Sequence, residues 1–287
     1  MERGPYDLAM ADLGIDTSVE GRNGTYTALL SRDWEIWGPM GGYVASTALR
    51  AAGAHASFPR PASLAGHFLG VAAFGPVDIT TTTLRKAKKA ESMRITVTQQ
   101  GNPVFEALVW AVADELDALT HEAVEPPPPA GAPLDHPTVL ERLAAAGVDP
   151  DPIYPFWKNF EERPVDWVDD WENRTPGAPV WTAWLRFLPD PDTSDPWIDA
   201  SRLLVLVDIG SWPSVTRHHV DTAGMYAPSI DLACHFHRFR PESAHLLVHG
   251  TSPSGADGLI TSHQSVWSDD GTFLASGISQ LLCRPAR

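Results

Sequence analysis

The feature that most constrains the fold of this chain is an internal repeat. The hexapeptides LAGHFL and LACHFH share a pattern, and their histidines, His67 and His235, are 168 positions apart. Phe105 and Phe273, in the segments GNPVFEA and DGTFLA, are separated by the same 168 positions. Two anchors about forty residues apart therefore share one register without a gap, which indicates that an ancestral domain was duplicated.

Each copy has the pattern of a helix followed by long antiparallel strands. Residues 77–112 and 243–282 carry β-branched residues in alternation, interrupted by turn-forming residues. In the first copy, a Gly-rich entry precedes 43–52, a run of small residues that suits a helix packed inside a sheet. The comparable segment of the second copy, 208–224, is a poorer helix former, and we expect a short helix there. This order predicts an α+β double hotdog, in which two tandem antiparallel sheets each wrap around a central helix.

Length and composition agree with two modules. The 287 residues exceed the usual size of one domain, and 43% of them are hydrophobic, enough for real cores. The segment EPPPPAGAPLDHP is typical of a stiff connector, and the capping box from Thr138 to Glu141 predicts a short helix after it. We expect an N-terminal domain over 1–115, a linker over 116–165, and a C-terminal domain over 166–287 that carries the functional residues.

The net charge of −15 argues against two classes of partner. Nucleic acids and anionic membranes attract dense clusters of Lys and Arg, so neither is expected to bind. The segment MERGPYDLAMADLG has no apolar stretch like that of a signal peptide, and no run is long enough to span a bilayer. Cys234 and Cys283 lie in apolar stretches and are expected to be thiols. These features predict a cytoplasmic protein.

An ordered set of motifs resembles one known family. In the first copy the matching stretches are SLAGHFL, GPVDITTTTLRKAKK and QQGNPVF; in the second they are APSIDLACHFHR, LLVHGTSPSGADG and VWSDDGTFLASGISQ. They are similar to the bacterial acyl-CoA thioesterase II family and its thioesterase-like relatives, which are double hotdogs. The resemblance spans nearly the whole chain outside 115–165. It implies hydrolysis of a fatty or related acyl-CoA to free acid and CoA, with no cofactor and no metal.

In that family an Asp, a Thr or Ser, and a Gln hold the water that attacks the thioester. The resemblance carries these roles to Asp208 in LVDIGS, Ser229 in PSID and Gln280 in ASGISQ. A carboxylate with an ordinary pKa is ionised at neutral pH and can accept the proton of the water. Hydroxyl and amide groups can orient that water but cannot act as the base. Asp231 is a rival base near Ser229.

Two further segments are candidates for binding the substrate. The backbone amides of Gly41, Gly42 and Tyr43 begin the first-copy helix, where positive potential favours a developing oxyanion. The segment LRKAKK, which includes Arg85 and Lys86, concentrates positive charge in a turn of an acidic chain. It is a candidate site for the phosphates of CoA, and alternatively a solvated hairpin tip.

Other readings of the sequence stay open. A hotdog enoyl-CoA hydratase would need an Asp/His acid–base pair, to which His67 or His235 could contribute. Zinc or iron could be bound by His235, His237 and a carboxylate. The chain could also bind acyl-CoA without catalysis. A serine-nucleophile α/β-hydrolase is disfavoured because the chain has no G-x-S-x-G motif.

Assembly is expected from the architecture. Open hotdog sheets leave edges and faces to cover, so we expect a homodimer or a higher homo-oligomer.

Overall fold

The computed structural model describes residues 11–127, 130–149, 154–171 and 173–286. The first half contains the helices α1 (Leu13–Asp16) and α2 (Gly41–His55), the 3-10 turn η1 (Arg32–Trp34), and the strands β1 (Glu20–Arg22), β2 (Thr25–Leu30), β3 (Arg60–Phe68), β4 (Gly75–Lys86), β5 (Ala90–Gln99) and β6 (Asn102–Val112). Between the halves lie η2 (Pro133–Asp135), α3 (Val139–Ala145) and η3 (Pro155–Asn159). The second half contains β7 (Phe160–Pro164), β8 (Val180–Phe187), α4 (Pro196–Ile209), α5 (Ser211–His218), β9 (Met225–Tyr226), β10 (Asp231–Phe236), β11 (Leu246–Ala256), β12 (Leu259–Ser268), β13 (Phe273–Leu282) and β14 (Arg284–Pro285).

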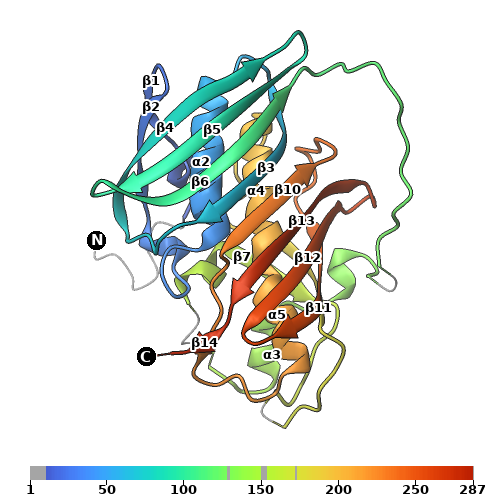
Figure 1. Ribbon diagram of the computed structural model, residues 1–287. Coiled ribbons are helices and arrows are strands. Elements are labelled where there is room, and N and C mark those ends of the chain that lie inside the picture. Colours follow the sequence, from blue (N-terminus) through green and yellow to red (C-terminus); the bar gives the residue numbers. More distant parts are fainter. Residues whose placement is uncertain (1–10, 128–129, 150–153, 172, 287) are drawn as a thin grey trace, which may run out of the picture.

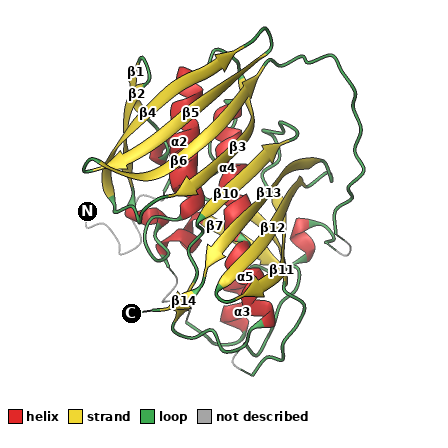
Figure 2. Ribbon diagram, viewed as in Figure 1, coloured by secondary structure: helices red, strands yellow, loops and turns green. Residues whose placement is uncertain are grey.

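Twelve of the strands form one continuous antiparallel sheet, in the order β1-β2-β4-β5-β6-β3-β10-β13-β12-β11-β8-β7 (Figure 1). The long helices α2 and α4 pack against each other and lie behind this sheet in the view of Figure 2. Each half is therefore an antiparallel sheet wrapped around one long helix. This is the α+β double hotdog that the sequence predicts.

The two central helices differ in how their sequences suit a buried position. α2 is rich in Ala, Ser and Thr, and its residues from 42 to 52 are buried apart from Arg50. α4 starts at Pro196, and its N-cap Asp195 accepts a hydrogen bond from the Trp197 amide. All residues of α4 from 199 to 209 are buried, as expected for a helix enclosed by a core. Within the described residues, no helix has the length and apolar character needed to cross a bilayer.

A pseudo-twofold axis relates the two halves. β3 and β10 are neighbours at the centre of the sheet, and Ala65 pairs with Ala233, its counterpart at the 168-residue offset. In the helix layer, the Ser46 hydroxyl donates to the Ser201 carbonyl oxygen over 3.0 Å. These two serines are 155 positions apart, as are the first residues of α2 and α4. A residue that meets its own counterpart lies on the symmetry axis, so both layers carry the duplication.

The two offsets differ by 13 residues, which are inserted between α4 and β10. There the second half builds α5 and β9, whereas the first half has only the turn 56–59 between α2 and β3. The short helix expected within 208–224 corresponds to α5, but it is not the central helix of the second half. That role belongs to α4, whose apolar run has no amphipathic period to mark it as a helix.

The gapless register predicted from Phe105 and Phe273 holds only in part. Phe105 pairs with Phe68, whereas Phe236, the counterpart of Phe68, pairs with Ala275. β13 is therefore shifted by two residues from its predicted alignment with β6. A shift of two keeps the same set of side chains facing the helices, because side chains in a strand alternate with a period of two.

The segment expected as a linker, 116–165, contains more structure than a connector. The helix α3 begins with the predicted capping box between Thr138 and Glu141. The same segment also contains β7, which pairs with β8. The sheet of the second half therefore begins before residue 166.

Candidate active site

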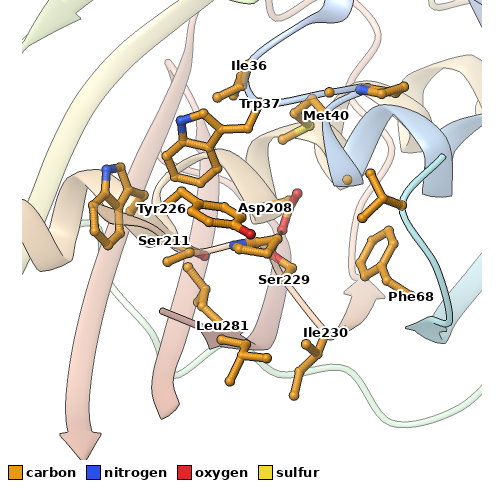
Figure 3. A pocket seen from close by; sticks show the side chains of 18 of the residues that line it. Ile36, Trp37, Met40, Phe68, Asp208, Ser211, Tyr226, Ser229, Ile230 and Leu281 are labelled. Carbon is orange, nitrogen blue, oxygen red and sulfur yellow. Dashed lines mark hydrogen bonds between the residues drawn. The ribbon is translucent and has the colours of Figure 1, made fainter. Parts of the chain in front are cut away.

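A cavity of about 740 Å³ opens where the N-terminus of α2 meets the C-terminus of α4. Its wall includes residues of α5, of β9 and of the segment before β10, so the 13-residue insertion supplies much of it. Figure 3 shows Trp37 and Tyr226 on one side of Asp208 and Phe68 on the other. Most of the lining is apolar, as in the side chains of Met40, Val44, Phe68, Ile209 and Leu281.

Asp208 is the buried acid of this cavity. It lies in the last turn of α4 and is 8% exposed. One carboxylate oxygen accepts a hydrogen bond from the Gly42 amide over 2.8 Å. The other accepts one from the Ser229 hydroxyl, also over 2.8 Å. The site therefore joins the start of one central helix, the end of the other, and the residues that lead into β10.

The surroundings of Asp208 change its acidity. Burial raises the pKa of Asp208 above its ordinary value of 3.8, and the hydrogen bonds from Ser229 and Gly42 offset part of that increase. A carboxylate with a raised pKa is a stronger proton acceptor when it is ionised. This is the property that a general base needs in order to take a proton from water.

Gly41 and Gly42 allow α2 to approach α4 closely. A Cβ atom on Gly41 would lie 2.8 Å from an oxygen of Asp208. One on Gly42 would lie 2.9 Å from the Cα of Val205. Side chains at these positions would therefore push the two helices apart or displace the carboxylate.

The amides of this turn have different uses. Gly42 donates to Asp208, and the Tyr43 amide donates to the Met40 carbonyl oxygen. The Gly41 amide has no hydrogen-bond partner among the described residues, and Gly41 lines the cavity. Of the three amides predicted to face an oxyanion, Gly41 is therefore the one that is available at this helix N-terminus.

Tyr43 does not serve the substrate site as predicted, because its amide is bonded to Met40 and its side chain belongs to the core. Its hydroxyl donates to the Asp16 carbonyl oxygen over 2.8 Å and accepts a hydrogen bond from the Ser31 amide. Tyr43 is fully buried, and burial raises the pKa of its hydroxyl. It anchors α2 to the N-terminal segment and does not line the cavity.

Two family models match the chain over most of its length. The model of the acyl-CoA thioesterase C-terminal domain matches residues 122–282, more than half of the chain. The chain belongs to the acyl-CoA thioesterase family. The model of the thioesterase N-terminal domain matches residues 30–112, so both halves carry the thioesterase signature.

Solved structures share the fold at low sequence identity. A proposed thioesterase II from Thermobifida fusca is 20% identical with a TM-score of 0.79, over 96% of this chain and 99% of that one. An acyl-CoA thioesterase II from Mycobacterium marinum is 21% identical with a TM-score of 0.75, over 95% and 98% of the two chains. A protein of unknown function with a hot dog fold from Alicyclobacillus acidocaldarius gives 21% and 0.75, over 96% and 98%. A search of curated proteins finds no match.

Gln280, the third residue expected from the thioesterase family, does not join Asp208 and Ser229. In β13, Ser279 and Leu281 are buried, and Ser279 contacts Ser211 on α5 through its hydroxyl. The side chain of Gln280 lies between them in sequence and so points to the opposite face of the sheet. It does not line the cavity, and its amide therefore cannot hold a water at Asp208.

Arg85 and Lys86 lie at the wrong end of α2 to serve this cavity, which corrects the expected phosphate site. The Lys86 ammonium donates to the Ser57 hydroxyl over 2.6 Å, and Ser57 follows the C-terminus of α2. Asp208 meets the opposite end of this 15-residue helix, about 22 Å away along the helix axis. The basic segment forms the hairpin tip between β4 and β5.

The histidines of the repeat are on the outer face of the sheet. His67 and His235 are exposed, while the residues before them in the strands, Gly66 and Cys234, are buried. Asp231, the rival base, accepts a hydrogen bond from the backbone N–H of Gln280 over 2.7 Å. None of these three residues is part of the cavity lining. Within the described part of the chain, no three potential metal ligands gather into a group.

Sequence reasoning missed Ser211 and the aromatic residues of the cavity. Ser211 is buried, lines the cavity and follows Asp208 by three positions, a spacing that was visible in LVDIGS. Trp37 meets Trp212 and Tyr226 in edge-to-face contacts, with ring centroids 5.8 and 5.9 Å apart. These rings come from three separate segments, so no local pattern could have grouped them.

The pseudo-symmetric end of the helix pair has no such site. At the 155-residue offset, Gly42 corresponds to Trp197, and Asp208 corresponds to Gly53. Trp197 packs on Gly53 so closely that a Cβ atom there would lie 2.6 Å from the indole ring. The aromatic ring thus fills the space where the second half keeps its carboxylate.

Proposed function

We propose that this protein hydrolyses acyl-CoA thioesters, with Asp208 as the general base and Ser229 as the group that orients the attacking water. The single observation that carries the proposal is the buried carboxylate on the cavity wall, held by the Gly42 amide and the Ser229 hydroxyl. Membership of the thioesterase family supports the choice of substrate class.

The proposed reaction has two steps. Asp208 takes a proton from water while the water oxygen bonds to the thioester carbon, and the carbonyl oxygen becomes an oxyanion. The Gly41 amide is the proposed donor to that oxyanion. The carbon–sulfur bond then breaks, and the CoA sulfur leaves with the proton returned from Asp208. The products are the free acid and the CoA thiol.

The experiment is thiol release from acyl-CoAs with short, long and aromatic acyl groups, followed with a thiol-reactive dye. The wild type should release thiol from at least one class, and Asp208→Asn should not do so at a comparable rate. Asp231→Asn is the matched control, because that carboxylate lies outside the cavity lining. Thiol release that survives Asp208→Asn unchanged would remove Asp208 from the mechanism.

The hydratase reading has less support. It depends on a histidine near the substrate, and no described histidine lines the cavity. Hydration of crotonyl-CoA without thiol release would reverse this preference. Binding of acyl-CoA with neither reaction would identify a non-catalytic binder.

A homo-oligomer is a separate proposal that rests on the outer face of the sheet. Leu108 and Ile278 are about half exposed there, and the pairing aligns them with Ala65 and Ala233 across the four central strands. An apolar row at the pseudo-twofold axis suits contact with a second copy.

Sedimentation analysis tests this proposal. The wild type should sediment as a dimer or a larger species, and Ile278→Glu should weaken the self-association. A monomeric wild type would contradict the proposal.

A further inference from the structure

Arg284 is held in a fixed position at the cavity. Strand β14 pairs with β9 so that Arg284 lies opposite Tyr226. The guanidinium carbon is 4.8 Å from the centre of the Tyr226 ring. A guanidinium placed over an aromatic ring is attracted to the ring and still has N–H donors for other partners. The arrangement presents a pre-oriented set of donors suited to an anionic group.

Among the residues that the structure describes, the charge of Arg284 has no ion-pair partner. Among the described residues that line the cavity, Arg284 is the one Lys or Arg. The net charge of the whole chain is −15, so an anionic substrate meets general repulsion elsewhere. The guanidinium of Arg284 is therefore the place at this cavity where an anionic group gains the most electrostatic attraction.

Position along the cavity indicates which part of a thioester this anionic group belongs to. Arg284 is exposed, whereas Asp208 is buried in the same cavity. A thioester that reaches Asp208 places its reacting carbon inside and its other end towards solvent. A cavity of about 740 Å³ has the size of a site for one drug-sized ligand, so a nucleotide would remain at the mouth.

We propose that Arg284, stacked on Tyr226, binds the phosphate groups of the CoA moiety while the thioester lies at Asp208. The inference rests on the proposed function and adds the subsite that distinguishes CoA from a simple thiol. It also replaces the hairpin residues Arg85 and Lys86, which lie at the other end of α2.

The test compares two thioesters of the same acyl group, one of CoA and one of N-acetylcysteamine, which has no phosphate. Arg284→Gln should raise KM for the CoA thioester by about tenfold or more, because a charge-assisted hydrogen bond is lost. It should leave kcat little changed and leave the N-acetylcysteamine kinetics as in the wild type. Arg284→Lys should recover part of the loss. Arg85→Gln is the matched control and should change neither substrate.

Salt provides a second readout. Added salt screens the attraction between the guanidinium and phosphate, which raises KM for the CoA thioester, and the general repulsion from the acidic chain, which lowers it. The ratio of KM in Arg284→Gln to KM in the wild type should therefore fall as ionic strength rises. Circular dichroism of the three variants checks that the fold is kept.

Three outcomes would overturn the assignment. Equal losses on both thioesters would mean that Arg284 acts on the fold or on the reacting centre. A loss confined to substrates with a carboxylate on the acyl group would assign the guanidinium to that carboxylate. If the wild type hydrolyses neither thioester, the proposed function fails, and calorimetric titration with CoA then tests the binding site by itself. Equal affinity of the wild type and Arg284→Gln for CoA would end the inference. Weaker binding of CoA by the variant would support it.

Discussion

At the scale of single residues, the buried carboxylate of Asp208 is costly for the fold, and the proposed mechanism gives it the role of the base. Its carboxylate is buried against apolar neighbours, and among the described residues two hydrogen bonds, from the Gly42 amide and the Ser229 hydroxyl, compensate for its charge. Asparagine can keep both contacts, with its oxygen facing Gly42 and its NH₂ group facing Ser229. Asp208→Asn should therefore lower kcat by about 10²–10⁴-fold while the variant still folds.

The same substitution should change the pH dependence of stability. The folded pKa of Asp208 is raised, so its contribution to stability is complete below the unfolded pKa and is lost as pH rises through the folded pKa. Asp208→Asn lacks this loss. Its denaturation midpoint relative to wild type should thus be higher at pH 8 than at pH 4, as measured by urea unfolding. A variant that is less stable at both pH values by the same amount would contradict this.

In the proposed mechanism, Ser229 tunes the pKa of the base as well as orienting the water. Its hydrogen bond lowers the pKa of Asp208, so Ser229→Ala should raise that pKa further. The acidic limb of kcat/KM, which reports ionisation of the base, should then move to higher pH. A uniform loss of rate with an unmoved limb would assign Ser229 a purely structural role.

The sequence predicted part of the site at this scale and missed the rest for physical reasons. Asp208 and Ser229 could be found from the family motifs, and they lie within hydrogen-bonding distance. Gln280 could not be judged, because a shift of one position in a strand moves a side chain to the other face. Arg284 and Tyr226 meet only through the pairing of β14 with β9, which no local pattern indicates.

At the scale of elements, the contact between α2 and α4 is set by glycines at both ends. Replacing a glycine inside a helix by alanine normally stabilises the helix by about 1 kcal/mol. Here a Cβ atom would lie 2.6 Å from the Trp197 ring, and overpacking costs about 1–3 kcal/mol. Gly53→Ala should therefore lower the melting temperature while kcat stays the same.

A double-mutant cycle tests the cause. Trp197→Leu makes room for the added methyl group, so Gly53→Ala should cost less in that background than in the wild type. Equal costs in both backgrounds would show that the strain lies elsewhere.

The elements themselves were predictable to different degrees. The small residues of 43–52 predicted α2 well, and the alternation in 77–112 predicted the strands β4, β5 and β6. α4 was missed because residues 203–207 are all apolar, and such a run fits a buried strand as well as a buried helix. The 168-residue offset from α2 leads to the segment 208–224, so the repeat predicts the helix there instead.

At the scale of the whole molecule, the two halves share their sheet and their helix layer. β3 pairs with β10, and α2 packs on α4, so neither half can open without exposing the core of the other. Calorimetry should give one unfolding transition, with equal calorimetric and van't Hoff enthalpies.

Leu64 and Leu232 offer a matched pair for this test. They are buried counterparts at the 168-residue offset, in β3 and β10. Either Leu→Ala variant should lose about 2–5 kcal/mol and shift the single transition without splitting it. A split transition in either variant would show that the halves unfold independently.

The indole of Trp197 over Gly53 has a consequence for how such a chain can evolve. When a single hotdog domain forms a dimer, one gene encodes both ends of the helix pair, and every mutation appears twice. Fusion of two copies removes that coupling. One end of the helix pair can then acquire a bulky side chain, while the other keeps its acid and gains inserted residues that line a cavity. A symmetric ancestor can thus give rise to a specialised site without a partner gene.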